Sequence, residues 1–293
     1  MKYEEFKETV RNEMRERLEK SKKVIINQVV KNNGTVYDGL IIIDPIHNIS
    51  PTIYLNPYYH RLLDGTSMEE IIDDIEESYY ENLPAEEFDI SLFKDWDKAK
   101  QKIIMKLINT KKNEELLENI PSAPFYDLSI IFCVAVCDFM NEYATILIHN
   151  EHLNFWDITQ EELYEIAKEN TPMLLPYLFE DMKNIIGEPV NVSFPQEMEM
   201  YLLTNRTKIN GAVSITYKGL LEEIAEKLND NFYIVPSSIH EVLIIPWKSV
   251  KEKYTFKDFS EMIEEVNETQ LMDDEVLSNH IYFYIKSEGN IYY

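Results

Sequence analysis

The sequence is poor in glycine, with seven glycines among 293 residues, roughly a third of average usage. It contains neither G-x-G-x-x-G nor G-x-x-x-x-G-K-S/T. A backbone that wraps around a phosphate needs closely spaced glycines, because only they combine positive φ angles with close approach. The sequence therefore disfavours Rossmann-type dinucleotide sites and P-loops, and we predict no cofactor.

Cysteine and long apolar runs are also scarce. The two cysteines, Cys133 and Cys137, would lie about 13 Å apart on a strand, which is beyond disulfide reach. Reduced thiols and a cytoplasmic location are therefore expected. The longest nearly uninterrupted apolar run, Leu128 to Cys137, has about half of the ~20 residues that a membrane-spanning helix needs. The opening MKYEEFKETVRNEM alternates acids and bases where a signal peptide would be apolar, so we expect neither export nor a membrane span.

Basic residues are outnumbered: 28 Lys and Arg stand against 53 Asp and Glu, a formal charge of -25. The negative electrostatic field of this charge repels phosphate backbones and anionic lipid heads. We therefore predict no direct contact with nucleic acid and none with a membrane. Between Glu69 and Asp97 the sequence has twelve acids and one base, Lys94. The simplest interpretation is a solvated helix face, and the alternatives are a docking face for a basic partner and mimicry of DNA charge.

The sequence has enough apolar residues to form a sizeable core, with 45% hydrophobic residues and 12% aromatics. Its pattern predicts an α+β fold with antiparallel or mixed sheets and helices packed on one side. VIINQVV and TVYDGLIII flank Asn33-Gly34, which predicts a hairpin with a type I′ turn. Elsewhere we expect three units of strand, polar turn, strand and helix, whose helices begin near Ser67, Thr159 and Thr255. In the second unit LNFW is expected to be a strand.

Three further features concern chain organisation. Thr171-Pro172 predicts that one helix ends and another begins. Ala212 to Thr216 is expected to be a strand, because it is a short apolar run. The segment NIPSAP predicts a division into two closely packed α+β halves, residues 1–122 and 123–293, although one integrated domain is the alternative.

Candidate chemistry lies in the polar turns. A two-residue turn at Asn150-Glu151 would make His149 and His152 cross-strand neighbours able to share a metal ion. A metal site normally needs a third ligand, and none lies at a recognisable spacing, so we predict no metal and keep this pair as the candidate ligands. If the turns converge, His240 and its neighbours would join the two histidines.

The turn PSSIHEV, residues 236–242, carries Ser237, Ser238, His240 and Glu241. It supports a hydrolase hypothesis with His240 as base, Glu241 as its orienter or an acid, and a serine or His149 assisting. No G-x-S-x-G elbow is present, and HEVLI lacks the second histidine of a zinc protease. The competing interpretation is structural, because Ser238 and Glu241 have the spacing of a capping box over one helical turn.

Five segments carry a resemblance: KNNG, PTIYLN, ATILIHNEHL, LTNRTKINGA and PSSIHEVLIIP. They are similar to segments that mark a bacterial family known as a domain of unknown function and found mainly in gut Clostridia-type Firmicutes. The resemblance covers most of the chain in order. It implies an intracellular bacterial protein and brings no activity, cofactor or catalytic residue with it.

The function expected from these features is that of a non-enzymatic binding or regulatory protein that acts on a basic protein partner. The acidic segment from Glu69 to Asp97 is the feature behind this expectation. The alternatives are the hydrolase centred on the polar turns and a DNA-mimic protein. The sequence predicts no particular oligomeric state.

Overall fold

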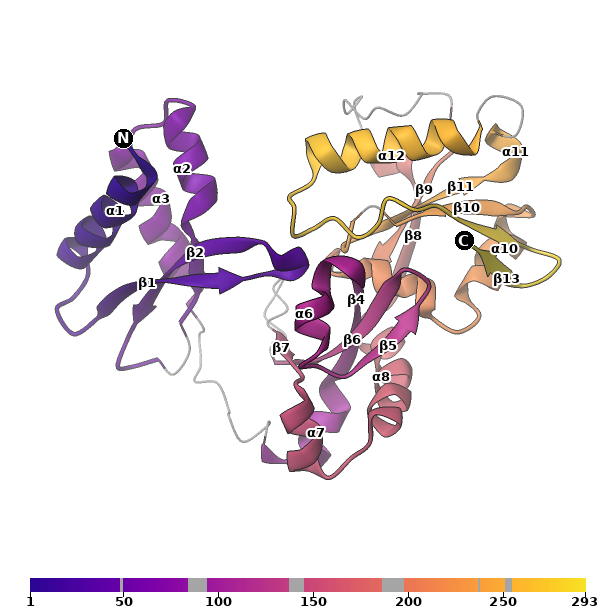
Figure 1. Cartoon of the computed structure of the whole chain (residues 1–293), viewed down its shortest axis with the longest axis horizontal. Coiled ribbons are helices and arrows are strands. Elements are labelled where there is room, and N and C mark those ends of the chain that lie inside the picture. Colours follow the sequence, from indigo (N-terminus) through magenta and orange to yellow (C-terminus); the bar gives the residue numbers. More distant parts are fainter. Residues whose placement is uncertain (48–49, 84–93, 137–144, 186–197, 237, 251–254) are drawn as a thin grey trace. The chain divides into compact units, whose positions relative to one another are not determined.

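The computed structural model describes residues 1–47, 50–83, 94–136, 145–185, 198–236, 238–250 and 255–293. The chain forms two compact units, residues 1–91 and 92–293. The predicted boundary between residues 122 and 123 lies inside the second unit, within strand β5 (Ser122–Phe125). Within the described ranges all strand pairs are antiparallel. The predicted α+β fold is confirmed (Figure 1).

Unit 1 is a three-stranded sheet with helices on one face (Figure 1). Its elements are α1 (Tyr3–Arg17), β1 (Lys23–Val30), η1 (Asn32–Gly34), β2 (Val36–Ile43), β3 (Thr52–Tyr54), α2 (Leu55–Leu63) and α3 (Met68–Glu81). The strand order is β1-β2-β3. Val24, Leu40 and Ile42 from one sheet face bury against Phe6 of α1 and Ile72 of α3. Burial of this kind, about 25 cal/mol per Å² of apolar surface, is the main stabilising term.

The predicted hairpin is confirmed, with a different turn. Lys31 N–H donates to Thr35 O at 2.7 Å, which closes a three-residue loop instead of a two-residue type I′ turn. Asn33 and Gly34 both have positive φ angles, 60° and 68°. Glycine and asparagine are the residues that tolerate this conformation, so the pair fixes the loop as the sequence predicts.

Unit 2 contains two sheets. The smaller has β4 (Ile103–Asn109) and β6 (Leu128–Ala135) side by side, with β5 and β7 (Thr145–Leu147) both pairing with the other edge of β6. Every residue of β6 is buried. The helical elements here are α5 (Trp96–Ala99), η2 (Lys100–Lys102), η3 (Lys111–Asn113), α6 (Glu114–Leu117), α7 (Asn150–Trp156) and α8 (Gln160–Leu174).

The larger sheet has six strands in the order β13-β12-β10-β11-β9-β8. These are β8 (Tyr177–Asp181), β9 (Tyr201–Asn205), β10 (Phe232–Val235), β11 (Val242–Pro246), β12 (Tyr282–Ile285) and β13 (Asn290–Tyr292). Its helical elements are α9 (Met182–Ile185), η4 (Gly211–Thr216), α10 (Leu220–Leu228), α11 (Trp247–Val250) and α12 (Phe256–Gln270). Phe259 of α12 buries against Tyr233 and Ile245 on one face, and α12 crosses that face (Figure 1). The 3-10 segment η4 contacts β9 and β11.

Local capping predictions are confirmed, since Ser67, Thr159 and Thr255 each accept a hydrogen bond from the backbone N–H three residues on. Such caps contribute typically ~1 kcal/mol each. Among the described helices, none is long and apolar enough to cross a membrane.

Three predictions are wrong. LNFW belongs to helix α7 and not to a strand, and Ala212 to Thr216 is 3-10 helix. In both cases the apolar run is short, so periodicity cannot separate strand from helix. Helix α8 runs through Pro172, because a proline in the last turn removes only one helical hydrogen bond before the helix ends.

Thr171 connects α8 to the edge of the smaller sheet. Its side chain is fully buried, and its hydroxyl accepts from Met105 N–H at 2.9 Å and donates to Ala167 O at 2.5 Å. Met105 lies on edge strand β4, so this amide would otherwise be buried without a partner. One side chain therefore satisfies the sheet edge and fixes the helix upon it.

We predict that Thr171→Val destabilises the chain by about 1–3 kcal/mol, because the replacement keeps the shape and leaves the Met105 amide unsatisfied. Urea denaturation measures the loss, and hydrogen exchange at the Met105 amide locates it. Thr171→Ser keeps the hydroxyl and should keep that amide protected. Equal exchange rates at Met105 in the wild type and in Thr171→Val would contradict the assignment.

Candidate functional site

The turn between β10 and β11 is the centre of the sequence hypothesis. Ser238 is buried and forms an isolated antiparallel bridge with Val276. Its Oγ accepts from the backbone N–H of His240 at 3.0 Å. The predicted helical turn is wrong, because Val242 begins β11 at once and leaves no room for a helix after the serine. Ser237 lies outside the described residues.

Two neighbouring segments hold this turn by backbone hydrogen bonds. Ala212 N–H donates to Ile239 O at 3.2 Å, from the side of η4. On the other side, Ile239 N–H donates to Glu275 O at 2.9 Å, and Ser278 N–H donates to Pro236 O at 2.9 Å. The turn is therefore paired along most of its length, as a strand would be.

The approach of the β9–η4 connection to this turn is unusually close. A β-carbon on Gly211 would meet Thr204 Oγ1 at 2.1 Å and His240 O at 2.6 Å. Thr204 Oγ1 donates to His240 O at 2.8 Å, and the Asn205 side chain closes the loop by donating to Ile209 O at 2.9 Å. Glycine is needed at position 211 because no other side chain fits between these backbones.

The His240 ring is held from two directions. Its Nδ1 accepts from the backbone N–H of Asn210 at 3.2 Å, and its Nε2 lies 3.6 Å from Glu275 Oε1. Because Nδ1 accepts a hydrogen bond, the proton of the neutral ring is on Nε2. The lone pair that a general base would use is thus directed at a backbone amide, and Ser238 contacts the backbone of His240.

Glu241 and Glu275 complete the cluster. Burial raises the pKa of Glu241, and the Glu275 carboxylate raises it further, while His240 and the Ser238 hydroxyl lower it. Sequence reasoning missed Glu275, because it lies in an irregular segment distant in sequence and no motif connects it to the turn. The cluster pairs two carboxylates around one imidazole, and among the described residues the contacts of the His240 ring are with Asn210 and Glu275 and not with a serine hydroxyl.

A second polar cluster, also missed, surrounds Asp127 at the β5–β6 turn. Its Oδ2 accepts from Ser278 Oγ at 2.6 Å and lies 2.9 Å from His280 Nδ1, while its Oδ1 accepts from the Tyr282 hydroxyl. Although burial raises the pKa of Asp127, the three hydrogen bonds outweigh it and leave that pKa below its ordinary value. The carboxylate therefore ties the smaller sheet to the segment that leads into β12.

His149 and His152 lie at the start of α7. The backbone N–H of His149 donates to His152 Nδ1 at 2.9 Å, and the two rings are 5.7 Å apart. The predicted cross-strand pairing is wrong, since one residue precedes the helix and the other is in its first turn. Burial lowers the pKa of His152, and His149 lowers it further. The contacts of His240 are with other segments, Asn210 and Glu275.

Metal-ligating side chains do not gather in the part of the chain that the structure describes. No group of three or more His, Cys, Asp or Glu residues is placed there to hold a metal ion. Cys133 is a buried free thiol whose pKa burial raises, and Cys137 lies outside the described residues. The residues described thus offer neither a thiolate nucleophile nor a ligand set.

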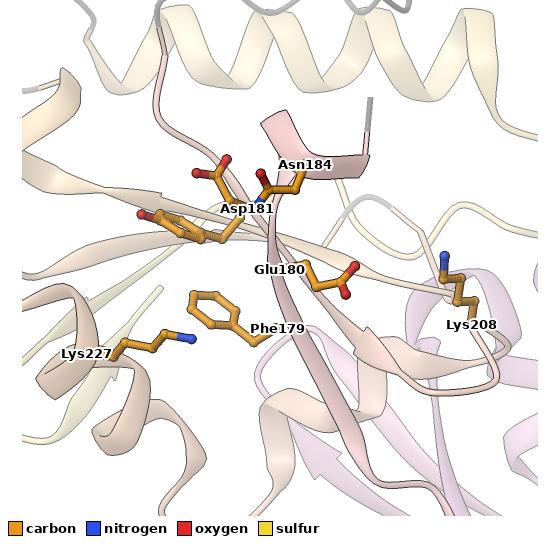
Figure 2. Close-up of a pocket in the computed structure, with 7 residues that line it drawn as sticks. Phe179, Glu180, Asp181, Asn184, Lys208 and Lys227 are labelled. Atoms are coloured by element: carbon orange, nitrogen blue, oxygen red, sulfur yellow. The ribbon is translucent and has the colours of Figure 1, made fainter. Parts of the chain in front are cut away.

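A hollow of about 550 Å³ lies along strand β8 (Figure 2). Its lining residues come from β8, β9, α9, α10 and a loop: Phe179, Glu180, Asp181, Asn184, Tyr201, Lys208 and Lys227. The Phe179 and Tyr201 rings are stacked at 5.0 Å, and Lys227 Nζ is 4.9 Å from the Phe179 centroid. Burial and a hydrogen bond to Glu199 raise the pKa of Tyr201 to about 12. The phenol therefore stays neutral at physiological pH.

The acidic segment divides between the two units. Seven of its acids lie on α3 of unit 1, and Asp95 and Asp97 belong to unit 2. Glu86, Glu87 and Asp89 lie outside the described residues. Arg17 of α1 pairs with Asp73 of α3 at 2.5 Å, and Arg61 of α2 pairs with Asp74 of α3 at 2.5 Å. Within unit 1, the described acids of this segment therefore all lie on α3.

We predict that Glu241→Gln stabilises the chain at pH 7. The pKa of Glu241 is raised in the folded state, so its contribution to stability is complete below its unfolded pKa and is lost as pH rises through the folded pKa. Glutamine cannot ionise and keeps that contribution. Urea denaturation should show a more stable variant at pH 7 and a difference that vanishes toward pH 4. A wild type at least as stable as the variant at pH 7 would refute the effect of burial.

We further predict that Gly211→Ala destabilises the chain by about 1–3 kcal/mol or more, because the added methyl overlaps two backbones. Thermal denaturation measures the loss. In a double variant that also lacks the Thr204 hydroxyl, part of the lost stability should return, because one of the atoms that the added methyl overlaps is gone. A variant as stable as the wild type would show that the close approach is not a constraint.

Comparison with known proteins gives one match. The model of a family described as "Family of unknown function (DUF5688)" matches residues 3–286, which span most of both units. No curated protein and no solved structure matches the chain. The resemblance expected from the five sequence segments is confirmed as far as a family of unknown function. The chain belongs to the DUF5688 family.

Proposed function

We propose that the chain is a binding protein that holds a basic protein partner through the outer face of α3. The observation that carries the proposal is the row of exposed carboxylates on that helix: Glu69, Glu70, Asp73, Glu77 and Glu81. Within the described residues Glu69, Glu77 and Glu81 form no ion pair. A basic partner would neutralise them.

The charge pattern works against the helix itself. Asp73, Glu77 and Glu81 follow one another at four-residue spacing, and like charges at that spacing destabilise a helix by about 0.2–0.5 kcal/mol per pair. Glu77 and Glu81 also lie toward the C-terminal end, where the helix dipole disfavours negative charge. These costs support a role for the acids outside the fold.

An aromatic residue lies among the acids. Tyr80 is 50% exposed although its neighbour Tyr79 is fully buried. Tyrosine is enriched at protein interfaces because it combines a large apolar surface with a polar hydroxyl. Exposed carboxylates around an exposed tyrosine fit a basic protein surface better than they fit a small ligand.

The hydrolase alternative has less support, because the His240 lone pair is directed at the Asn210 amide. Mimicry of DNA has no observation specific to it. We also propose a cytoplasmic location, which the buried free thiol of Cys133 supports.

The test compares two sets of four substitutions to glutamine. The interface variant changes Glu69, Glu70, Glu77 and Glu81, and the control changes four exposed acids on α8 and α12: Glu169, Glu264, Glu265 and Glu268. Both remove the same charge. If each interface carboxylate contributes about 0.2–1 kcal/mol, the interface variant should bind its partner about fourfold to several hundredfold more weakly.

Affinity capture from cell lysate at low and at raised salt supplies the partner. A protein held by these charges should be released as salt screens them. It should be captured by the control variant and lost from the interface variant. Equal capture by the two variants, or no salt-sensitive partner at low salt, would refute the proposal.

A further inference from the structure

Strand β8 ends the six-stranded sheet. Among the residues that the structure describes, it pairs with a single neighbour, β9, in the register Tyr177↔Asn205 to Asp181↔Tyr201. A strand at a sheet edge presents backbone donors and acceptors that another chain can use. The direction of these groups in β8 follows from two backbone hydrogen bonds at its ends.

Met182 N–H donates to Met200 O at 3.0 Å, and Arg206 N–H donates to Pro176 O at 3.0 Å. In an antiparallel pair, residues alternate between those that bond to the partner strand and those that point away from it. Even-numbered residues of β8 therefore bond to β9. Tyr177, Phe179 and Asp181 direct their N–H and C=O groups to the free edge.

On two other sheet edges in unit 2, a backbone group is hydrogen-bonded to a side chain. On β4, the Thr171 hydroxyl accepts from Met105 N–H. On β13, the Tyr126 hydroxyl donates to Ile291 O at 3.3 Å. In the described part of the chain, no such hydrogen bond reaches the outward groups of β8. Proteins usually protect an edge of this kind, so an edge that the described residues leave without such hydrogen bonds indicates use.

The hollow along β8 has walls on both faces of the sheet. Side chains alternate along a strand, so Phe179 and Asp181 share one face with Tyr201, and Glu180 is on the other. Figure 2 shows Lys227 beside Phe179, and Glu180 on the opposite side of the strand. A small-molecule pocket would open on one face. A hollow that extends over both faces of the edge strand fits a bound extended chain, because the side chains of that chain also alternate between the two faces.

The chemistry of each wall indicates what that chain carries. The stacked Phe179 and Tyr201 rings form the apolar part of one wall, which Lys227 and Asp181 border. On the other face Glu180 makes no ion pair within the described residues, and Lys208 lies on a separate loop (Figure 2). The net charge of -25 repels acidic segments. A peptide with one apolar face and one basic face would therefore complement the two walls.

We propose that β8 is a strand-addition site for an extended peptide with alternating apolar and basic side chains. The peptide backbone bonds to Tyr177, Phe179 and Asp181, its apolar side chains cover the ring stack, and its basic side chains face Glu180. This site belongs to unit 2 and does not depend on the proposed role of α3.

The probe is a capped, fluorescent peptide, Lys-Phe-Lys-Val-Lys-Phe-Lys, titrated with the full chain by anisotropy. Two peptides serve as matched controls: one has the same composition in a non-alternating order, and one is N-methylated at alternate residues on the edge facing β8. Both keep the charge, so general attraction to an acidic protein does not distinguish them. Each should bind at least tenfold more weakly than the probe.

On the protein side the informative variant is Tyr177→Pro. The Tyr177 N–H points away from β9, so proline blocks the edge without removing a β8–β9 hydrogen bond. Tyr177→Phe is the control, because both variants lose the 2.6 Å hydrogen bond from the Tyr177 hydroxyl to Glu223. The proline variant should bind the probe at least tenfold more weakly, at the melting temperature of the phenylalanine variant, and the phenylalanine variant should bind as the wild type does.

The proposal is overturned if the wild type binds the N-methylated or the reordered peptide as tightly as the probe, or binds none of them. Equal binding by Tyr177→Pro and the wild type also overturns it. The four-glutamine α3 variant should bind the probe normally, which separates failure of this site from failure of the α3 interface. Loss of probe binding in that variant would contradict an independent β8 site.

Discussion

The carbonyl oxygen of His240 lies 2.6 Å from the position that a β-carbon on residue 211 would occupy. This close approach brings the connection after β9 against the turn between β10 and β11. Thr204 donates to the same carbonyl, and Asn210 donates to the histidine ring. The arrangement of the larger sheet near its polar turn follows from this single contact, because it fixes how near the two connections can lie.

Hydrogen bonds hold the polar side chains of this turn and of the Asp127 cluster. His240 uses its free lone pair on a backbone amide, Ser238 uses its hydroxyl oxygen on another, and Asp127 accepts from three donors. Buried polar groups with such partners stabilise a fold and give up reactivity in doing so. The two proposed binding sites use other groups, the carboxylates of α3 and the outward backbone groups of β8.

The sequence predicts features that depend on near neighbours. The caps at Ser67, Thr159 and Thr255 and the hairpin at Asn33-Gly34 are local, since every participating group lies within a few residues. Short apolar runs were mispredicted, as at residues 150–156 and 212–216, because tertiary packing chooses their structure. Ser238 and His240 were predicted as candidate site residues because the turn PSSIHEV is rich in polar side chains. Glu275 and the Asp127–His280 pair were missed, because they meet only after distant segments have folded together.

The account rests on a structural role for His240, and its tautomer tests that role most directly. Nitrogen-15 NMR of the imidazole ring in the full chain at neutral pH reports which nitrogen is protonated, with His240→Gln to assign the signal. For the neutral form of the ring we predict a single tautomer, with the proton on Nε2 and with Nδ1 as a hydrogen-bond acceptor. A ring protonated at Nδ1 with a free Nε2, or one that exchanges between tautomers, would show that His240 is available as a base and would contradict the account.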